Sequence, residues 1–358
     1  MPDGTVRFAI VGCGVIAPMH ARAIGDVPGA ELVAVVDVVP ERAEKRGAEF
    51  GVEHYTELDR VLERPDVDAV CVCVPSGLHA EVGVRAAQAG KHVVVEKPID
   101  ITLEAADRLI GACHQAGVKL TVISQNRFAA GFRELRRLID GGRLGRLVLG
   151  DALIKWYRTQ AYYDSGDWRG TWALDGGGSL MNQGVHYVDM LQWAMGPVEK
   201  LVARTATSAH TIEVEDIALA LITFQNGALG VLEGTTAAYP GLNERLEVSG
   251  TEGTVIVEKG QVALCELKDE KGETSPYGGK TSAAEAAGPG GGAADPAAIS
   301  YRGHGAQLAD FVEAINTGRE PAITGEEGRK PLEIILAVYE SGRTGREVTL
   351  PLTVTPVR

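Results

Sequence analysis

The sequence lacks the surface features of a nucleic-acid or membrane protein. It has no long run of Lys or Arg, and its net charge is −13 over 358 residues, so a phosphate-binding face is not expected. No apolar stretch approaches the ~18 residues of a membrane-spanning helix, and the chain opens without the charged and apolar regions of a secretory leader. We therefore expect a small-molecule partner and neither nucleic acid nor membrane.

Cysteine and clustered histidine are also scarce. The five cysteines include no C-x-x-C pair, and Cys71 and Cys73 lie in an apolar run, where cysteine behaves as a small hydrophobe. This use of cysteine is typical of a reduced, cytoplasmic protein. The eight histidines include no H-x-x-x-H pair and no Cys/His cluster at ligand spacing, so no metal site is expected.

What is present is a long series of strand and helix patterns. A chain of 358 residues is expected to form two domains, because a single core seldom grows to that size. In residues 1–124 apolar strands alternate with amphipathic helices, which predicts an α/β Rossmann domain that binds NAD on a doubly wound parallel sheet. The strands expected there are 6–11, 31–37, 69–74, 92–96 and 119–124, and the helices are 19–24, 41–50, 80–89 and 103–116.

Residues 125–358 predict a different domain. Strand patterns follow one another with few helices between them, which predicts an α+β substrate-binding and oligomerisation domain on a large, mainly antiparallel open sheet. The strands expected are 147–156, 198–207, 216–224, 228–236, 245–250, 253–258 and 261–267, with helices at 180–194 and 307–315. Residues 272–299 are rich in Gly, Ala and Pro and predict either a lid over the active site or a mobile surface loop.

A G-x-G-x-x-A motif at residues 12–17 lies in the turn between the first strand and the first helix. Small residues there let backbone amides approach a pyrophosphate at the helix N-terminus. Asp37 ends the next strand and is expected to bind the ribose of NAD, whereas its charge would repel the 2′-phosphate of NADP. The cofactor contacts expected from this region are Gly12, Gly14, Val15, Ile16 and Asp37.

Two further strand ends lie at the same edge of the sheet. Pro75, Ser76 and His79 follow one of them and are expected to flank the nicotinamide ribose, although Ser76 could instead cap the next helix. Residues 96–98, Glu-Lys-Pro, follow the other. The proline disfavours helical geometry at Lys97 and allows a cis peptide, which would aim the ammonium at the crevice. There it would stabilise the alkoxide that forms when a hydroxyl loses its proton.

The segment 175–194 predicts the catalytic base. Three glycines lead to Ser179, a candidate N-cap, and into a helix on which Asn182 and His186 share one face. The positive end of the helix dipole would keep His186 neutral and able to accept a proton. A structural histidine packed under the sheet is the alternative interpretation.

Aromatic and basic residues between 156 and 169 suit a sugar. Arg158 and Tyr163 are expected to contact the substrate, whereas Trp156 and Trp168 are expected to pack in the core or in an interface. His304 precedes an amphipathic helix and either reaches the active site or is exposed.

Together these motifs resemble the Gfo/Idh/MocA oxidoreductase family over nearly the whole chain. The residues that carry the resemblance are 12–17, 96–98, Gln125-Asn126-Arg127-Phe128 and the glycine-rich segment from Gly176 to His186. The resemblance implies that Lys97 and His186 are catalytic, that Glu96, Lys97 and Gln125 contact the cofactor, and that Lys97, Asn182 and His186 also bind the substrate. It further implies a homodimer or homotetramer formed through one face of the C-terminal sheet.

Asn182 stands where inositol dehydrogenases of that family have an aspartate. Residues 181–186 look more like the branch of UDP-N-acetylglucosaminuronate 3-dehydrogenases and related sugar 3-dehydrogenases. The sequence therefore predicts an NAD-dependent enzyme that oxidises a secondary hydroxyl of a sugar, sugar acid or sugar nucleotide. An inositol or cyclitol dehydrogenase, a keto-sugar reductase and a non-catalytic regulator that binds NAD and a sugar are the alternatives.

Overall fold

The computed structural model describes residues 4–268, 301–352 and 356, so the predicted loop at 272–299 lies outside the described residues. The chain forms two compact units. The first comprises Met1–Gln125, Thr171–Gly176 and Ser300–Leu332, and the second comprises Asn126–Gly170, Gly177–Ile299 and Glu333–Arg358. A division into a cofactor domain, 1–124, and a substrate domain, 125–358, stays a prediction. Among the helices of the described ranges, none combines the length and the apolar character needed to cross a membrane.

The first unit is built on a six-stranded parallel sheet with the order β3-β2-β1-β4-β5-β6. Its strands are β1 (Val6–Val11), β2 (Ala30–Val36), β3 (Glu53–Tyr55), β4 (Ala69–Val72), β5 (His92–Val95) and β6 (Leu120–Val122). The predicted doubly wound α/β fold is confirmed; the short strand β3 was not predicted. The strand order reverses between β1 and β4, and ligands of such sheets bind at the carboxyl edge beside this reversal.

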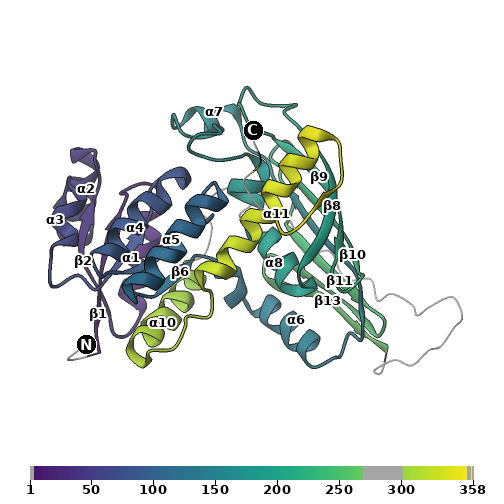
Figure 1. Ribbon diagram of the computed structural model, residues 1–358, viewed down its shortest axis with the longest axis horizontal. Helices are drawn as coiled ribbons and strands as arrows, with labels where there is room; N and C mark the ends of the chain where they lie inside the picture. The colour runs from purple at the N-terminus through teal and green to yellow at the C-terminus, as the bar shows by residue number, and fades with distance from the viewer. Residues whose placement is uncertain (1–3, 269–300, 353–355, 357–358) are drawn as a thin grey trace, which may run out of the picture. The chain divides into compact units, whose positions relative to one another are not determined.

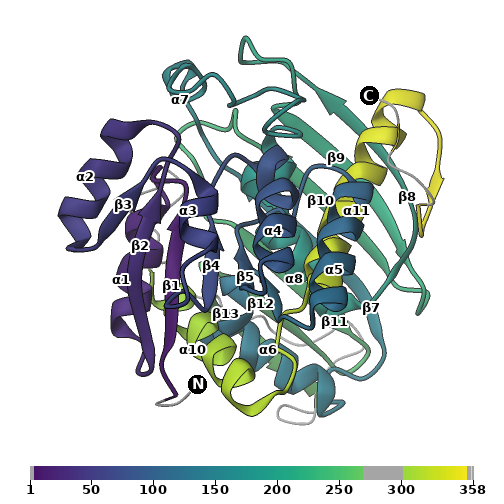
Figure 2. The ribbon, with the colours of Figure 1, turned by 60° about the vertical axis from the view of Figure 1, so that its left-hand side comes forward.

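Helices cover both faces of this sheet (Figure 1). They are α1 (Ala17–Asp26), α2 (Pro40–Phe50), α3 (Leu58–Leu62), α4 (His79–Gln88), α5 (Leu103–Ala116) and α10 (Arg302–Thr317), with a 3-10 turn η1 (Ser76–Leu78). Helix α4 packs beside α5, and α10 packs beside α1 (Figure 2). Leu308 and Phe311 of α10 share a core with Ala17 and Ile24 of α1. Residues that follow 300 therefore complete the first unit.

The second unit is built on an eight-stranded sheet with the order β13-β12-β11-β7-β10-β9-β8-β14. Its strands are β7 (Leu147–Lys155), β8 (Val198–Ala206), β9 (Ile217–Phe224), β10 (Leu229–Thr235), β11 (Arg245–Gly250), β12 (Gly253–Glu258), β13 (Gln261–Leu267) and β14 (Val348–Thr349). Only β7 and β10 pair in parallel, so the predicted mainly antiparallel sheet is confirmed. The helices of the described part of this unit are α6 (Ala130–Asp140), α7 (Gln160–Asp164), α8 (Val185–Met195) and α11 (Gly325–Thr344), the last of which begins in the first unit.

The two faces of the eight-stranded sheet differ. Alternate residues of β7 are buried against α8, and a Cβ at Gly150 would meet Met195 of that helix. The opposite face carries exposed aliphatic side chains, which include Leu149, Val202, Leu219, Leu221 and Leu229. Leu221 pairs with Val231 on β10 and with Val202 on β8. This continuous apolar row has the character of an interaction surface.

Candidate active site

The glycine-rich turn after β1 forms an open cradle. Gly12 has φ +99°, and a Cβ there would lie 2.5 Å from the Cys73 carbonyl oxygen, so only glycine fits. A Cβ at Gly14 would meet nothing within 4 Å, which leaves room for a ligand to approach the backbone. Helix α1 begins without a side-chain cap, so its first amides can bind a pyrophosphate.

Asp37 lies beside this turn at the end of β2. Its Oδ2 accepts a hydrogen bond from the Cys13 amide at 2.8 Å, and its Oδ1 accepts one from the Val39 amide at 2.9 Å. Each carboxylate oxygen keeps a second lone pair that can accept from a ribose hydroxyl. The arrangement therefore fits the ribose of NAD.

The segment after β4 contacts two loops at the carboxyl edge of the sheet through the side chain of His79. The buried His79 ring lies 2.7 Å from the Pro98 carbonyl oxygen and 2.9 Å from the Val74 carbonyl oxygen, and burial lowers its pKa. Its ring nitrogens thus face the backbone, and a cofactor contact stays a prediction. The alternative, that Ser76 caps the next helix, α4, is wrong. The side chain that accepts a hydrogen bond from the first turn of α4 is Asp100, which binds the Ala80 amide.

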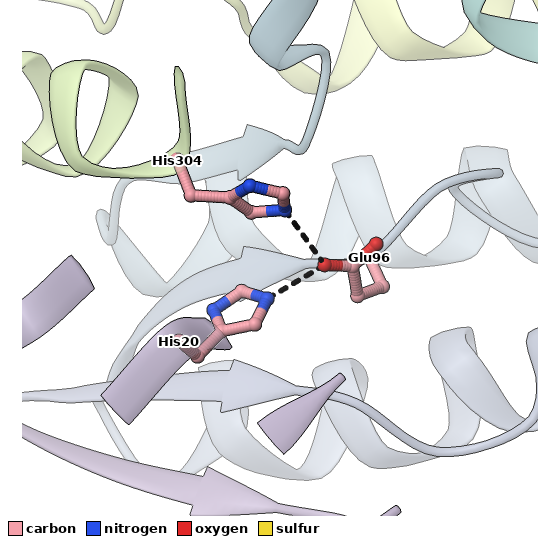
Figure 3. Close-up of side chains that lie close together, drawn as sticks. All are labelled: His20, Glu96 and His304. Atoms are coloured by element: carbon pink, nitrogen blue, oxygen red, sulfur yellow. Dashed lines mark hydrogen bonds and ion pairs between the residues drawn. The ribbon is translucent and has the colours of Figure 1, made fainter. Parts of the chain in front are cut away.

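Residues 96–98 follow β5. Lys97 is half-buried between the buried Glu96 and Pro98, and the Lys97–Pro98 peptide is cis, as the sequence allows. The Glu96 Oε1 lies 2.6 Å from His20 Nε2 on α1 and 3.6 Å from His304 Nε2 on α10 (Figure 3). His304 is therefore buried, and the alternative of an exposed His304 is wrong. His20 was missed, because nothing in the sequence shows that the inner face of α1 meets the end of β5.

Gln125 lies at the start of the turn η2 (Gln125–Phe128). It is buried, and within the described residues its Oε1 has no hydrogen-bond partner. A buried acceptor without a partner is costly, so this amide oxygen suits a donor on a bound cofactor. The cradle, Asp37 and Gln125 together fit NAD.

The segment with Asn182 and His186 begins in the second unit with a π-helical turn, η3 (Ser179–Gly184), that runs into α8. The prediction that Ser179 is the N-cap is wrong, because its hydroxyl donates to Glu215 and to the Gly234 carbonyl. The π-helical turn also places His186 beyond the first turn of the helical run. The helix dipole falls off within one turn, so it does not explain a neutral His186.

Glu215 takes the capping role. Its carboxylate accepts from the amides of Gly178 at 2.8 Å and Leu180 at 3.0 Å, and from the Tyr339 hydroxyl at 3.0 Å. Burial outweighs these donors and raises its pKa to about 7. Sequence reasoning missed Glu215, because it follows the capped turn by more than thirty positions.

Arg158 and Tyr163 lie in a buried aromatic cluster of the second unit. The Tyr163 hydroxyl is 2.7 Å from Thr236 Oγ1, and the Arg158 guanidinium lies 4.8 Å from the centre of the Trp156 ring. Burial lowers the pKa of Arg158. Trp156 packs in the interior, as expected, while Trp168 is half-buried beneath a neighbouring arginine. Whether Arg158 and Tyr163 touch substrate stays a prediction.

Known proteins resemble the chain over nearly its full length. Residues 6–124 match the family described as "Oxidoreductase family, NAD-binding Rossmann fold", and residues 132–256 match "GFO/IDH/MocA C-terminal domain". The WlbA dehydrogenase from Bordetella pertussis, solved with NADH and UDP-GlcNAcA, is 35% identical, with a TM-score of 0.84 over 97% of this chain and 99% of that one. The 1,5-anhydro-D-fructose reductase of Ensifer adhaerens is 30% identical over 95% of this chain and 97% of its own length. The myo-inositol 2-dehydrogenase of Thermotoga maritima is 27% identical over 96% and 98%.

The matched family models place the protein among the nicotinamide-dependent oxidoreductases. The chain belongs to the Gfo/Idh/MocA oxidoreductase family and has the NAD-binding Rossmann fold of that family. The resemblance, the enzyme class and the cofactor expected from the motifs are thereby confirmed.

Proposed function

We propose that the protein is an NAD-dependent dehydrogenase that oxidises a secondary hydroxyl of a sugar, sugar acid or sugar nucleotide to a ketone, with C3 of a uronic-acid sugar nucleotide as the reacting position. The observation that carries the proposal is the Lys97 side chain at the carboxyl edge of the Rossmann sheet, between buried Glu96 and Pro98. The similarity to WlbA dehydrogenase, whose structure holds NADH and UDP-GlcNAcA, supports the substrate class.

The proposed reaction breaks one O–H bond and one C–H bond. Bound NAD⁺ supplies the acceptor for the hydride that leaves the carbon. His186 takes the hydroxyl proton, and Lys97 offers positive charge to the alkoxide oxygen. The ketone leaves, and His186 passes its proton to water. Reduction of a keto sugar would use the same two side chains in reverse.

The residues proposed to hold NAD lie in the first unit. Backbone amides of Gly12, Gly14, Val15 and Ile16 would receive the pyrophosphate, and Asp37 the adenosine ribose. The polar and backbone groups proposed beside the nicotinamide end are Pro75, Ser76, His79, Glu96, Lys97 and Gln125. The position of Asp37 favours NAD over NADP, because its carboxylate would repel a 2′-phosphate.

The residues proposed to bind substrate are Lys97, Arg158, Tyr163, Asn182 and His186. An amide at Asn182 can both donate to and accept from a sugar hydroxyl. A cyclitol is the second candidate substrate, which the similarity to myo-inositol 2-dehydrogenase favours. The asparagine at 182, in place of the aspartate expected of inositol dehydrogenases, argues for the sugar.

A homodimer or homotetramer is proposed to form through the exposed face of the eight-stranded sheet. The row of Val202, Leu221 and Val231 supports this assembly, because an apolar sheet face gains by excluding water. A reduced, cytoplasmic setting is supported by the thiols of Cys13, Cys71, Cys73 and Cys113, all of which are buried.

A substrate panel tests the proposal. Purified protein and NAD⁺ are mixed with UDP-N-acetylglucosaminuronate, glucuronate, glucose, a simple glycoside or myo-inositol, and NADH is followed by absorbance. We expect the sugar nucleotide to give the highest kcat/KM. Turnover of myo-inositol alone would establish the cyclitol alternative, and NAD binding without turnover of any compound would favour an untested glycoside as substrate or the regulator.

A further inference from the structure

Three buried titratable side chains cluster around Glu96, the residue directly before Lys97 in the sequence. His20, Glu96 and His304 come from α1, the end of β5 and α10, and all three are buried (Figure 3). His20 Nε2 is 2.6 Å from Glu96 Oε1, and His304 Nε2 approaches the same oxygen at 3.6 Å. The two imidazole rings meet edge to face with their centres 5.4 Å apart.

The ring nitrogens that face away from Glu96 indicate where the protons are. Within the described residues, Nδ1 of His20 and Nδ1 of His304 are buried without a hydrogen-bond partner. A ring protonated on Nδ1 alone would bury an N–H without an acceptor and would leave Nε2 without a proton for Glu96, which is costly. Each ring is therefore expected to carry a proton on Nε2, directed at the carboxylate.

The helix ends agree with this assignment. His20 lies in the first turn of α1 and His304 in the first turn of α10, where the helix dipole favours a nearby anion. Burial raises the pKa of the Glu96 carboxyl, but hydrogen bonding and charge attraction from His20 and His304 outweigh burial and hold that pKa well below the usual range. The cluster is thus a buried carboxylate held between two imidazole rings.

The other oxygen of Glu96 reaches the catalytic segment. Glu96 Oε2 accepts from the backbone amide of Lys97 at 3.2 Å. On the far side of Lys97, the His79 ring contacts the Pro98 carbonyl oxygen at 2.7 Å. The backbone from which Lys97 extends is therefore held on both sides.

We propose that His20 and His304 are positioning residues that act through Glu96, fixing the carboxylate that in turn fixes the backbone at Lys97. The proposal rests on the proposed function, because Lys97 is the group whose position matters to the reaction. A displacement of about 1 Å at a reacting group can cost as much as a hundredfold in rate. The network would therefore act chiefly on kcat, because the proposed pyrophosphate and adenosine-ribose contacts at residues 12–16 and Asp37 lie elsewhere in the first unit.

A divalent metal ion is the competing interpretation of two imidazoles and a carboxylate. A metal bound to both Nε2 atoms would force the protons onto Nδ1, where no acceptor lies within the described residues. Ligating histidines ordinarily donate their second N–H to a partner. The 2.6 Å separation of His20 Nε2 and Glu96 Oε1 is also a hydrogen-bond distance.

Paired substitutions at His20 provide the test. Glutamine places an N–H near the position of Nε2, whereas leucine fills similar space without a donor. We expect H20L to lower kcat about tenfold or more, with KM for NAD⁺ within about twofold, and H20Q to restore most of the rate. The matched control is H114Q, which removes a histidine from an exposed pair with Glu326. A loss of melting temperature with unchanged kcat in H20L, or equal losses in H20L and H20Q, would overturn the proposal.

Nitrogen-15 spectra of the histidines test the network without substrate. His20 and His304 resonances, assigned from H20Q and H304Q, should report a proton on Nε2 of each ring. Protonation on Nδ1 alone, or one equivalent of tightly bound metal in the wild-type protein that H20L loses, would contradict the network. If no sugar yields NADH, the proposed function fails while these spectra still decide the state of the cluster.

Discussion

At the scale of single residues, the carboxylate of Asp37 does two tasks. It accepts hydrogen bonds from the backbone amides of Cys13 and Val39 and so links the glycine turn to the end of β2. It is also the group proposed to bind the ribose. We expect D37N to weaken NAD⁺ binding about tenfold, or 1.4 kcal/mol, and to narrow the preference over NADP⁺, because a repulsive charge is removed. Titration calorimetry with both cofactors measures this.

The control for that substitution is D26N, at an exposed position near the end of α1. It should leave both cofactor affinities unchanged. An unaltered ratio of NAD⁺ to NADP⁺ affinity in D37N would show that another group selects the cofactor.

The positions of residues that belong to a motif could be predicted, and long-range partners could not. Strand, turn and helix patterns place the turn at 12–17, Asp37 and Lys97 at one sheet edge, while their roles stay predictions. His20 and Glu215 were missed because their partners, Glu96 and Gly178, come from other parts of the chain. Long-range pairing of this kind carries no local sequence signal.

At the scale of elements, the start of the helical run that carries Asn182 and His186 depends on Glu215. Burial raises the pKa of Glu215 from 4.5 to about 7. Between these pH values Glu215 is ionised in the unfolded chain but still protonated in the folded chain. Its contribution to the free energy of unfolding is therefore complete below pH 4.5 and falls as the pH rises to about 7. The loss amounts to about 3 kcal/mol, at 1.36 kcal/mol per unit.

We expect E215Q to remove that pH dependence, because an amide does not ionise. Urea unfolding gives the free energy of unfolding of wild type and E215Q at pH 4.5 and at pH 8. The difference between the two proteins should change by about 3 kcal/mol from one pH to the other. E213Q, at an exposed position two residues away, is the control. Parallel pH profiles for wild type and E215Q would show that the Glu215 carboxylate is ionised throughout.

Element types were easier to predict than element ends. The parallel strands and most of the antiparallel strands follow the predicted ranges, because apolar alternation determines them. The π-helical start of the segment at Ser179–Gly184 was not foreseen, because the Glu215 carboxylate and close glycine contacts shape it. Helix α6 was also missed, although Phe132, Leu135 and Leu138 recur at helical spacing along its buried side.

At the scale of the whole molecule, the exposed face of the eight-stranded sheet is the feature that a single chain leaves unsatisfied. We expect L221E to convert the proposed dimer or tetramer to monomers, because a charge would be buried in the row of Val202, Leu221 and Val231. Light scattering after gel filtration measures the mass. A48E adds the same charge at an exposed position of α2 and should leave the oligomer intact; an unchanged mass in L221E would locate the interface elsewhere.

The most direct test of the proposed catalytic role of Lys97 compares wild type, K97A and K45A. Lys45 is an exposed lysine of α2. NADH formation from NAD⁺ and UDP-N-acetylglucosaminuronate is followed, with NAD⁺ affinity measured on the same samples. We expect K97A to lose turnover while its NAD⁺ affinity stays within a few-fold of wild type, and K45A to be unaffected. Turnover by K97A at a near wild-type rate would contradict the assignment of Lys97 to the reaction.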